Sequence, residues 1–129
     1  MDTREKHIDL TVVPALLENG KWAVVTGLFD PLTLVQAERL AAAAEHGRSL
    51  LVIVDPSSPT LLSADARAAL VAALRQVKAV VIADRADWEL VLSSFPHVRI
   101  FCDEAAERAR SDAFTTFVLE RQRSAEVLT

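Results

Sequence analysis

The chain has 129 residues, of which 51% are hydrophobic, and it carries 14 Lys and Arg against 18 Asp and Glu. This length fits a single domain, residues 1–129, with enough apolar material for a buried core, and it argues against a second domain. The net charge of −4, without a basic stripe, argues against nucleic acid as a partner.

The residues at the start of the chain and the cysteine content indicate in which cellular compartment the protein is found. Residues 1–7 are charged and lead into no signal-peptide-like segment, and no apolar run approaches the roughly 18 residues of a membrane span. We therefore expect a cytoplasmic protein without a membrane partner. The only cysteine, Cys102, excludes an internal disulfide, and its place at the end of an apolar run favours a buried structural thiol. The histidines are scattered and support no metal site.

Apolar runs and helical spacing alternate along the chain. Residues 8–20 predict a short helix on the sheet, despite Pro14. Strands are then expected at 22–26, 50–54, 77–83 and 98–102. Helices are expected at 34–46, at 64–76 after a Ser63 cap, through 88–92 after an Asp84 or Asp87 cap, and at 103–110 and roughly 114–124.

The expected strands are apolar on both faces and alternate with helices, which is typical of a parallel sheet covered on both sides. The sequence therefore predicts an α/β fold, a small doubly wound, Rossmann-like parallel sheet with helices on both faces. Ligands of open α/β sheets bind beyond the carboxyl ends of the strands. Here those ends lie near residues 26–33, 55–63 and 83–85.

The most distinctive stretch is the first strand-to-helix junction, residues 27–36, which reads Gly-Leu-Phe-Asp-Pro-Leu-Thr-Leu-Val-Gln. Neither GxGxxG nor GxxxxGK followed by Ser or Thr is present. The junction instead resembles the GxFDxxHxGH signature of the nucleotidylyltransferase superfamily, which includes glycerol-3-phosphate cytidylyltransferase and heptose 1-phosphate adenylyltransferase. The leucine-rich stretch before the first strand, residues 16–21, and residues 72–81 are similar to the heptose enzymes as well.

The signature is kept in part. Gly27, Phe29 and Asp30 match it, while Thr33 replaces the first histidine, as in the phosphopantetheine adenylyltransferases. Val35 occupies the glycine position, and Gln36 occupies the second histidine position. The resemblance makes all of these except Val35 candidate nucleotide-binding residues within a degenerate HxGH motif.

The substitutions bear on the chemistry that the resemblance implies. In these enzymes a phosphate oxygen attacks the α-phosphate of a nucleoside triphosphate, and the second histidine stabilises charge on the transferring group. Gln36 offers only a neutral hydrogen bond, and loss of one preorganised donor commonly costs on the order of 100 to 1,000-fold in rate. A β-branched Val35 also occupies space where glycine allows close approach. No residue is therefore assigned a catalytic role.

A structural interpretation exists for the same residues. Thr33 and Gln36 have the spacing of a capping box, which stabilises a helix start without any ligand and is the interpretation we favour for them. Gly27 and Asp30 are also ordinary turn formers. Their combination with Phe29 after a buried strand favours a ligand, because the amides at a helix start attract anions.

The C-terminal part offers weaker candidates. Arg110, Thr115 and Thr116 resemble a family segment in which an arginine and hydroxyl residues contact the triphosphate, although the threonines are more simply helix caps. The loop of residues 55–63 lacks the cation that active relatives commonly supply there. Arg67 is interpreted either as a solvated helix residue or as an arginine near the active-site edge.

Three functions follow. The preferred one is a nucleotidylyltransferase-like domain, catalytically degenerate, that binds a nucleotide or a phosphorylated small molecule. The second is an active transferase that joins a nucleoside triphosphate to a sugar or polyol phosphate with Mg²⁺ and releases pyrophosphate. The third is a structural or oligomerisation module, since the resemblance implies a homodimer.

Overall fold

The computed structural model describes residues 3–57 and 60–102. The elements in chain order are the 3-10 turns η1 (Thr3–Lys6) and η2 (Leu10–Val12), then α1 (Val13–Leu17), β1 (Trp22–Gly27), α2 (Leu34–Ala43), β2 (Ser49–Val54), α3 (Ala64–Ala72), β3 (Val77–Ile82), α4 (Arg85–Leu92) and β4 (Arg99–Cys102). None of the helices in these ranges has the length and apolarity needed to cross a membrane.

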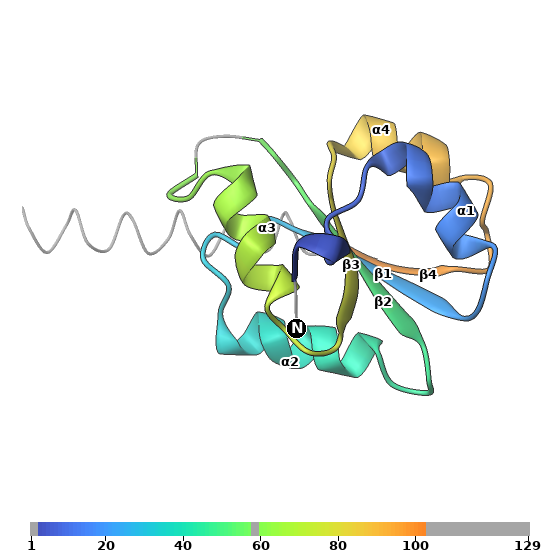
Figure 1. Ribbon diagram of the computed structural model, residues 1–129, viewed down its shortest axis with the longest axis horizontal. Coiled ribbons are helices and arrows are strands. Elements are labelled where there is room, and N and C mark those ends of the chain that lie inside the picture. Colours follow the sequence, from blue (N-terminus) through green and yellow to red (C-terminus); the bar gives the residue numbers. More distant parts are fainter. Residues whose placement is uncertain (1–2, 58–59, 103–129) are drawn as a thin grey trace, which may run out of the picture.

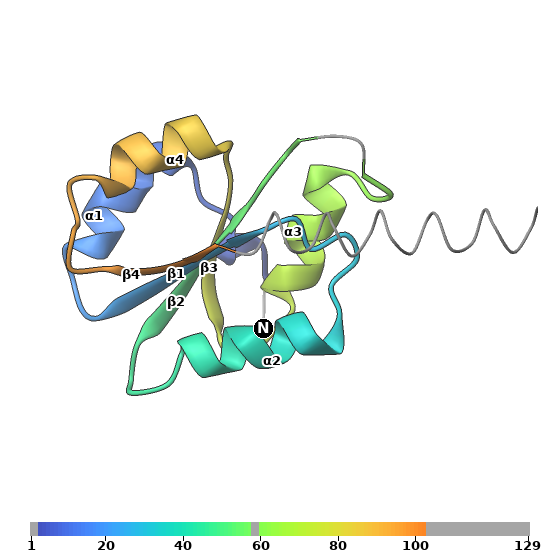
Figure 2. The same ribbon diagram turned by 180° about the vertical axis from the view of Figure 1, so that it is seen from behind.

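The strands form one parallel sheet in the order β3-β2-β1-β4. Helices α2 and α3 cover one face, and α1 and α4 cover the other (Figures 1 and 2). The predicted Rossmann-like α/β fold is therefore confirmed.

Two hydrophobic clusters fill the space between the sheet and its helices. One joins the odd-numbered side chains of β1 to Leu40 of α2 and Val71 of α3, and the other joins Val24 and Leu51 to Trp88 of α4. Five of the six residues are buried in both β1 and β2. These inner strands are mostly apolar on both faces because each face packs against a helix layer.

The two edges of the sheet differ. Along β3, residue His7 forms a parallel bridge with Val80, and the Ile8 amide donates to the Val80 carbonyl at 3.0 Å. The N-terminal segment therefore pairs with that edge. At the opposite edge, all four residues of β4 are exposed.

Helix boundaries depart from the predictions for identifiable reasons. Pro14 lies in the first turn of α1, where it needs no amide partner, so the predicted helix over 8–20 becomes η2 followed by a short α1. Helix α2 ends before His46 because His46 and Gly47 adopt left-handed backbone angles of 66° and 75° in φ.

Of the predicted caps, Ser63 is confirmed for α3, and Asp84 rather than Asp87 caps α4. The prediction of a buried Cys102 is wrong, because this residue ends an edge strand and is exposed. The predicted helices at 103–110 and 114–124 lie outside the described residues.

A substitution in the inner strand β2 tests whether the sheet is packed on both faces. Leu51 is 0% exposed, so we predict that Leu51→Ala lowers the free energy of unfolding by about 2–5 kcal/mol. Urea titration followed by tryptophan fluorescence measures the loss. The control Leu90→Ala, at a position 76% exposed, should change stability by less than about 0.5 kcal/mol. Similar losses in both variants would contradict this packing.

Candidate functional site at the start of helix α2

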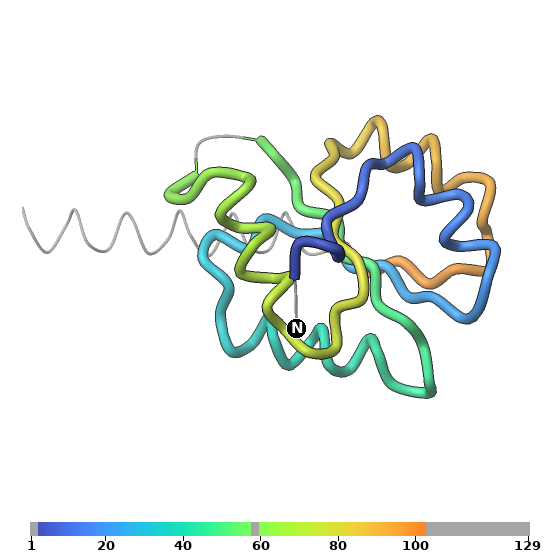
Figure 3. The backbone as a smooth tube through the Cα atoms, viewed as in Figure 1, coloured from blue at the N-terminus to red at the C-terminus, as the bar shows by residue number. Residues whose placement is uncertain are grey.

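The strand order places the topological switch point between β1 and β4. The chain leaves β1 toward β2 through α2 on one face, and it reaches β4 from β3 through α4 on the other face (Figure 3). Crevices that bind ligands in open α/β sheets form where the crossovers diverge in this way, beyond the carboxyl ends of the strands. The junction of residues 27–36 begins at this edge, directly after β1.

The loop after β1 turns inward before it reaches α2. Phe29 is 2% exposed, belongs to the core under α2 and α3, and has a left-handed φ of 52°. Such a φ is uncommon for a bulky residue and persists only where the surroundings hold it. Phe29 is therefore a packing residue that fixes the loop, and its ring is not available to stack on a ligand.

Asp30 braces the same loop against the segment before α3. Its two carboxylate oxygens accept hydrogen bonds from the Leu61 amide at 2.6 Å and the Leu62 amide at 2.8 Å. Gly27 contributes through its carbonyl, which accepts from the Asp55 amide at 2.9 Å. Asp30 and Gly27 thus join the loop after β1 to the loop after β2.

Arg67 connects the loop after β1 with the loop after β2 through hydrogen bonds from its guanidinium. Its Nη1 donates to the carbonyls of Leu28 at 2.9 Å and Asp55 at 2.6 Å, and its Nε donates to the Leu62 carbonyl at 3.2 Å. The side chain is 1% exposed, and it forms no ion pair with a carboxylate among the described residues. The interpretation of Arg67 as a solvated residue is therefore wrong.

A buried guanidinium is stable only where its donors are satisfied. The Arg67 donors bond to backbone carbonyl oxygens, so these oxygens stabilise the positive charge, and no carboxylate of the described residues neutralises it. The sequence carries one weak signal for this role, since Arg67 follows the Ser63 cap by one helical turn and can fold back toward the strand ends.

The capping box predicted for α2 is confirmed. The Gln36 amide donates to Thr33 Oγ1 at 3.3 Å, and the Thr33 amide donates to Gln36 Oε1 at 3.0 Å. Gln36 is 5% exposed. Its Nε2 makes no hydrogen bond to another described residue, so the side chain keeps donor capacity after capping.

The first turn of α2 is open to solvent. Leu34 is 74% and Val35 is 54% exposed, so Val35 does not pack into the protein and the space beside the turn is not filled. The backbone amides of both residues donate to no other group in the described chain. Two free amides at a helix start form a favourable contact for an anion.

One buried polar atom at this edge has no partner. Thr26 is 0% exposed, and its Oγ1 is the only buried side-chain N or O atom of the described residues without a hydrogen bond. Thr26 precedes Gly27 and lies opposite Cys102 in the β1–β4 register, which places it at the switch point. Unsatisfied buried groups are rare and concentrate at functional sites.

The structure brings Gly27, Phe29, Asp30, Thr33 and Gln36 together between the end of β1 and the first turn of α2. Arg110, Thr115 and Thr116 lie outside the described residues. Sequence reasoning missed the buried position of Arg67 and the unpartnered hydroxyl of Thr26.

Removing the Arg67 guanidinium tests its structural role. We predict that Arg67→Met lowers the free energy of unfolding by about 3 kcal/mol or more, because three carbonyl groups then lose their donor at roughly 1–3 kcal/mol each when buried. Chemical denaturation measures the change. The control Arg85→Met removes a guanidinium that is 63% exposed and paired with Glu89, and it should cost less than about 1 kcal/mol. Equal effects would contradict the bracing role.

A scan against protein-family models finds no match to this chain, and a search of curated proteins finds none either. The resemblance at residues 27–36 therefore stays a hypothesis, and it rests on Gly27, Phe29 and Asp30 at the observed strand-to-helix junction.

Proposed function

We propose that the chain is a nucleotidylyltransferase-like domain that binds a phosphate-bearing small molecule, a nucleotide or a sugar or polyol phosphate, without catalysing transfer. The observation that carries the proposal is the position of α2. The helix begins beside the switch point with its first turn open, and the amides of Leu34 and Val35 bond to none of residues 3–57 and 60–102. The resemblance to the GxFDxxHxGH signature concerns the same residues and supports the same ligand class.

The electrostatics of the junction support an anion. The start of α2 carries the positive end of the helix dipole, and Gln36 Nε2 adds donor capacity beside it. Arg67 lies beneath the loops with its charge uncancelled by a described carboxylate. Asp30 is the acidic residue of the junction, and backbone amides already occupy both of its oxygens.

The same contacts argue against catalysis. Gln36 is neutral, and its oxygen is committed to the capping box. Arg67 is committed to three carbonyl groups, so it would have to abandon them to reach a transferring phosphate. Within residues 3–57 and 60–102, the groups at this junction therefore offer no preorganised positive charge to the place where charge would develop during transfer.

A carboxylate at the open turn should abolish binding. In Val35→Asp the new charge lies at the second helical position, where it favours the helix by about 0.3–1 kcal/mol but repels a phosphate. We predict that calorimetry with CTP, ATP, CDP and AMP detects binding to the wild type that weakens at least about tenfold in Val35→Asp, a change of roughly 1.4 kcal/mol.

The control is Leu90→Asp, at an exposed apolar position on α4 at the opposite face of the sheet. It should leave binding unchanged. No heat and no melting shift with any of the four nucleotides or with sugar and polyol phosphates at millimolar concentration would refute the proposed function.

Active transfer remains a second candidate, and the open space beside Val35 favours it. The described residues do not fit a Mg²⁺ site at this junction, because both oxygens of Asp30 accept amides. The ion would therefore have to arrive on the triphosphate. Pyrophosphate release across a panel of sugar and polyol phosphates, measured with Mg²⁺ present, distinguishes this candidate from binding alone.

We predict no pyrophosphate release above background for the wild type in that panel. Restoring the signature with Val35→Gly and Gln36→His should not by itself create strong activity, because histidine at 36 also gives up the capping box, at about 0.5–2 kcal/mol of stability. Turnover by the wild type would exclude a purely binding domain. Turnover by the double variant alone would locate the defect at these two positions.

A further inference from the structure

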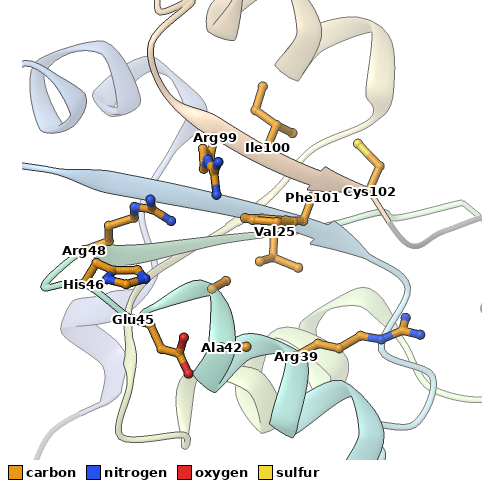
Figure 4. Close-up of a pocket in the computed structure, with 11 residues that line it drawn as sticks. Val25, Arg39, Ala42, Glu45, His46, Arg48, Arg99, Ile100, Phe101 and Cys102 are labelled. Atoms are coloured by element: carbon orange, nitrogen blue, oxygen red, sulfur yellow. The ribbon is translucent and has the colours of Figure 1, made fainter.

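A groove with a volume of about 660 Å³ runs between α2 and the edge strand β4. Figure 4 shows Val25 and Phe101 in its middle, His46 and Arg48 at one end, and Arg39 at the other. The middle of the groove is apolar and its ends are basic.

The side chains of strand β4 are more exposed than those of the inner strands, because fewer of the described residues pack over them. Phe101 is 42% and Ile100 is 38% exposed, whereas five of the six residues of β1 are buried. Parallel strands are normally covered on both faces. The described helices cover β1, β2 and β3, and none of them lies over the face of β4 that carries Phe101.

Residues 103–129, which follow β4 in the sequence, begin beside this uncovered face of the strand. Strand β4 ends at Cys102, which itself lines the groove, and residues 103–129 follow directly in the sequence. The sequence predicts a helix at roughly 114–124, about 16 Å long at 1.5 Å per residue. The four residues of β4 span about 13 Å, so the predicted helix is long enough to cover the strand.

The apolar residues of 114–124 have the spacing needed to pack against the apolar middle of the groove. Phe114, Phe117 and Val118 have the i, i+3, i+4 spacing that places them on one face of a helix. In isolation a helix of this length is marginal in water, so such a face requires a surface to pack against. Phe101 and Val25 offer one beside the point where the segment begins.

Charge complementarity supports the same occupant. The groove is lined by Arg39, Arg48, Arg99 and His46 against a single acid, Glu45. Arg48 and Arg99 form no hydrogen bond or ion pair with another described residue. Residues 103–129 contain six acidic and four basic side chains. Four of these acids and two of these bases lie within residues 103–112, whereas 114–124 carry one acid and two bases. The opposite net charge therefore favours association of residues 103–112 with the basic ends of the groove.

We propose that residues 103–129 dock in the groove between α2 and β4 and that the predicted helix at 114–124 packs Phe114, Phe117 and Val118 against Phe101 and Val25. The docked segment completes the layer over β4 as the N-terminal residues complete the β3 edge. This proposal does not depend on nucleotide binding at the start of α2.

Hydrogen exchange read out by mass spectrometry on the full chain tests the docking. In the wild type, the amides of 114–124 should exchange slowly, and in Phe101→Asp they should exchange at least about tenfold faster because the docked state is lost. The control Leu90→Asp changes an exposed leucine of α4 outside the groove and should leave this exchange unchanged. Amides of β1 and β2 should stay protected in both variants, which shows that the sheet is intact.

Arg99→Glu gives a second test that leaves the apolar middle of the groove, Val25 and Phe101, unchanged. The new charge should repel the acidic residues 103–112 and so release the docked segment. Exchange of 114–124 should therefore also become faster, and by more at low salt than at high salt, because ions screen the contact. Unprotected 114–124 amides in the wild type, or protection that survives both groove variants, would overturn the proposal. Protection that grows with protein concentration, together with a dimer in light scattering, would assign the groove to a second copy instead.

Discussion

The carboxyl edge of the sheet depends on one buried cation. Arg67 reaches from α3 to carbonyl groups of the loop after β1, the loop after β2 and the segment before α3 itself. Hydrogen bonds to a charged donor are worth more than neutral ones, and here a single side chain joins the loop after β1 to both ends of the loop between β2 and α3. A guanidinium that belongs to a residue 1% exposed stays buried only while both loops remain in place.

The candidate site follows from that constraint. With Arg67 beneath and Asp30 across the two loops, the chain after β1 has one path into α2, and Phe29 is held with a left-handed backbone inside the core. The acidic and aromatic residues of the signature thus build the frame and leave the first turn of α2 as the open surface. Among the described residues, this open turn offers backbone amides, and the positive charge of Arg67 is committed to carbonyl groups beneath it.

Local signals account for what the sequence predicted well. Apolar runs located all four strands, and the Thr33–Gln36 spacing predicted a capping box because its two hydrogen bonds join residues three apart. Contacts between distant segments were not predictable in the same way. The sequence left Arg67 as either a solvated residue or an arginine near the active-site edge, because its partners lie on loops distant in sequence. Cys102 was predicted to be buried because an apolar run does not reveal which strand will lie at the sheet edge.

The composition of β4 has a further consequence. Exposed edge strands recruit other strands, and short segments rich in Ile, Phe and Val without proline are prone to stack into aggregates. The run Val98-Arg99-Ile100-Phe101-Cys102 has this character except at Arg99, which is exposed and carries the only charge in the run. Arg99 therefore opposes aggregation through this edge. A second identical strand paired in parallel with β4 would place its own Arg99 beside this one, and the two like charges would repel.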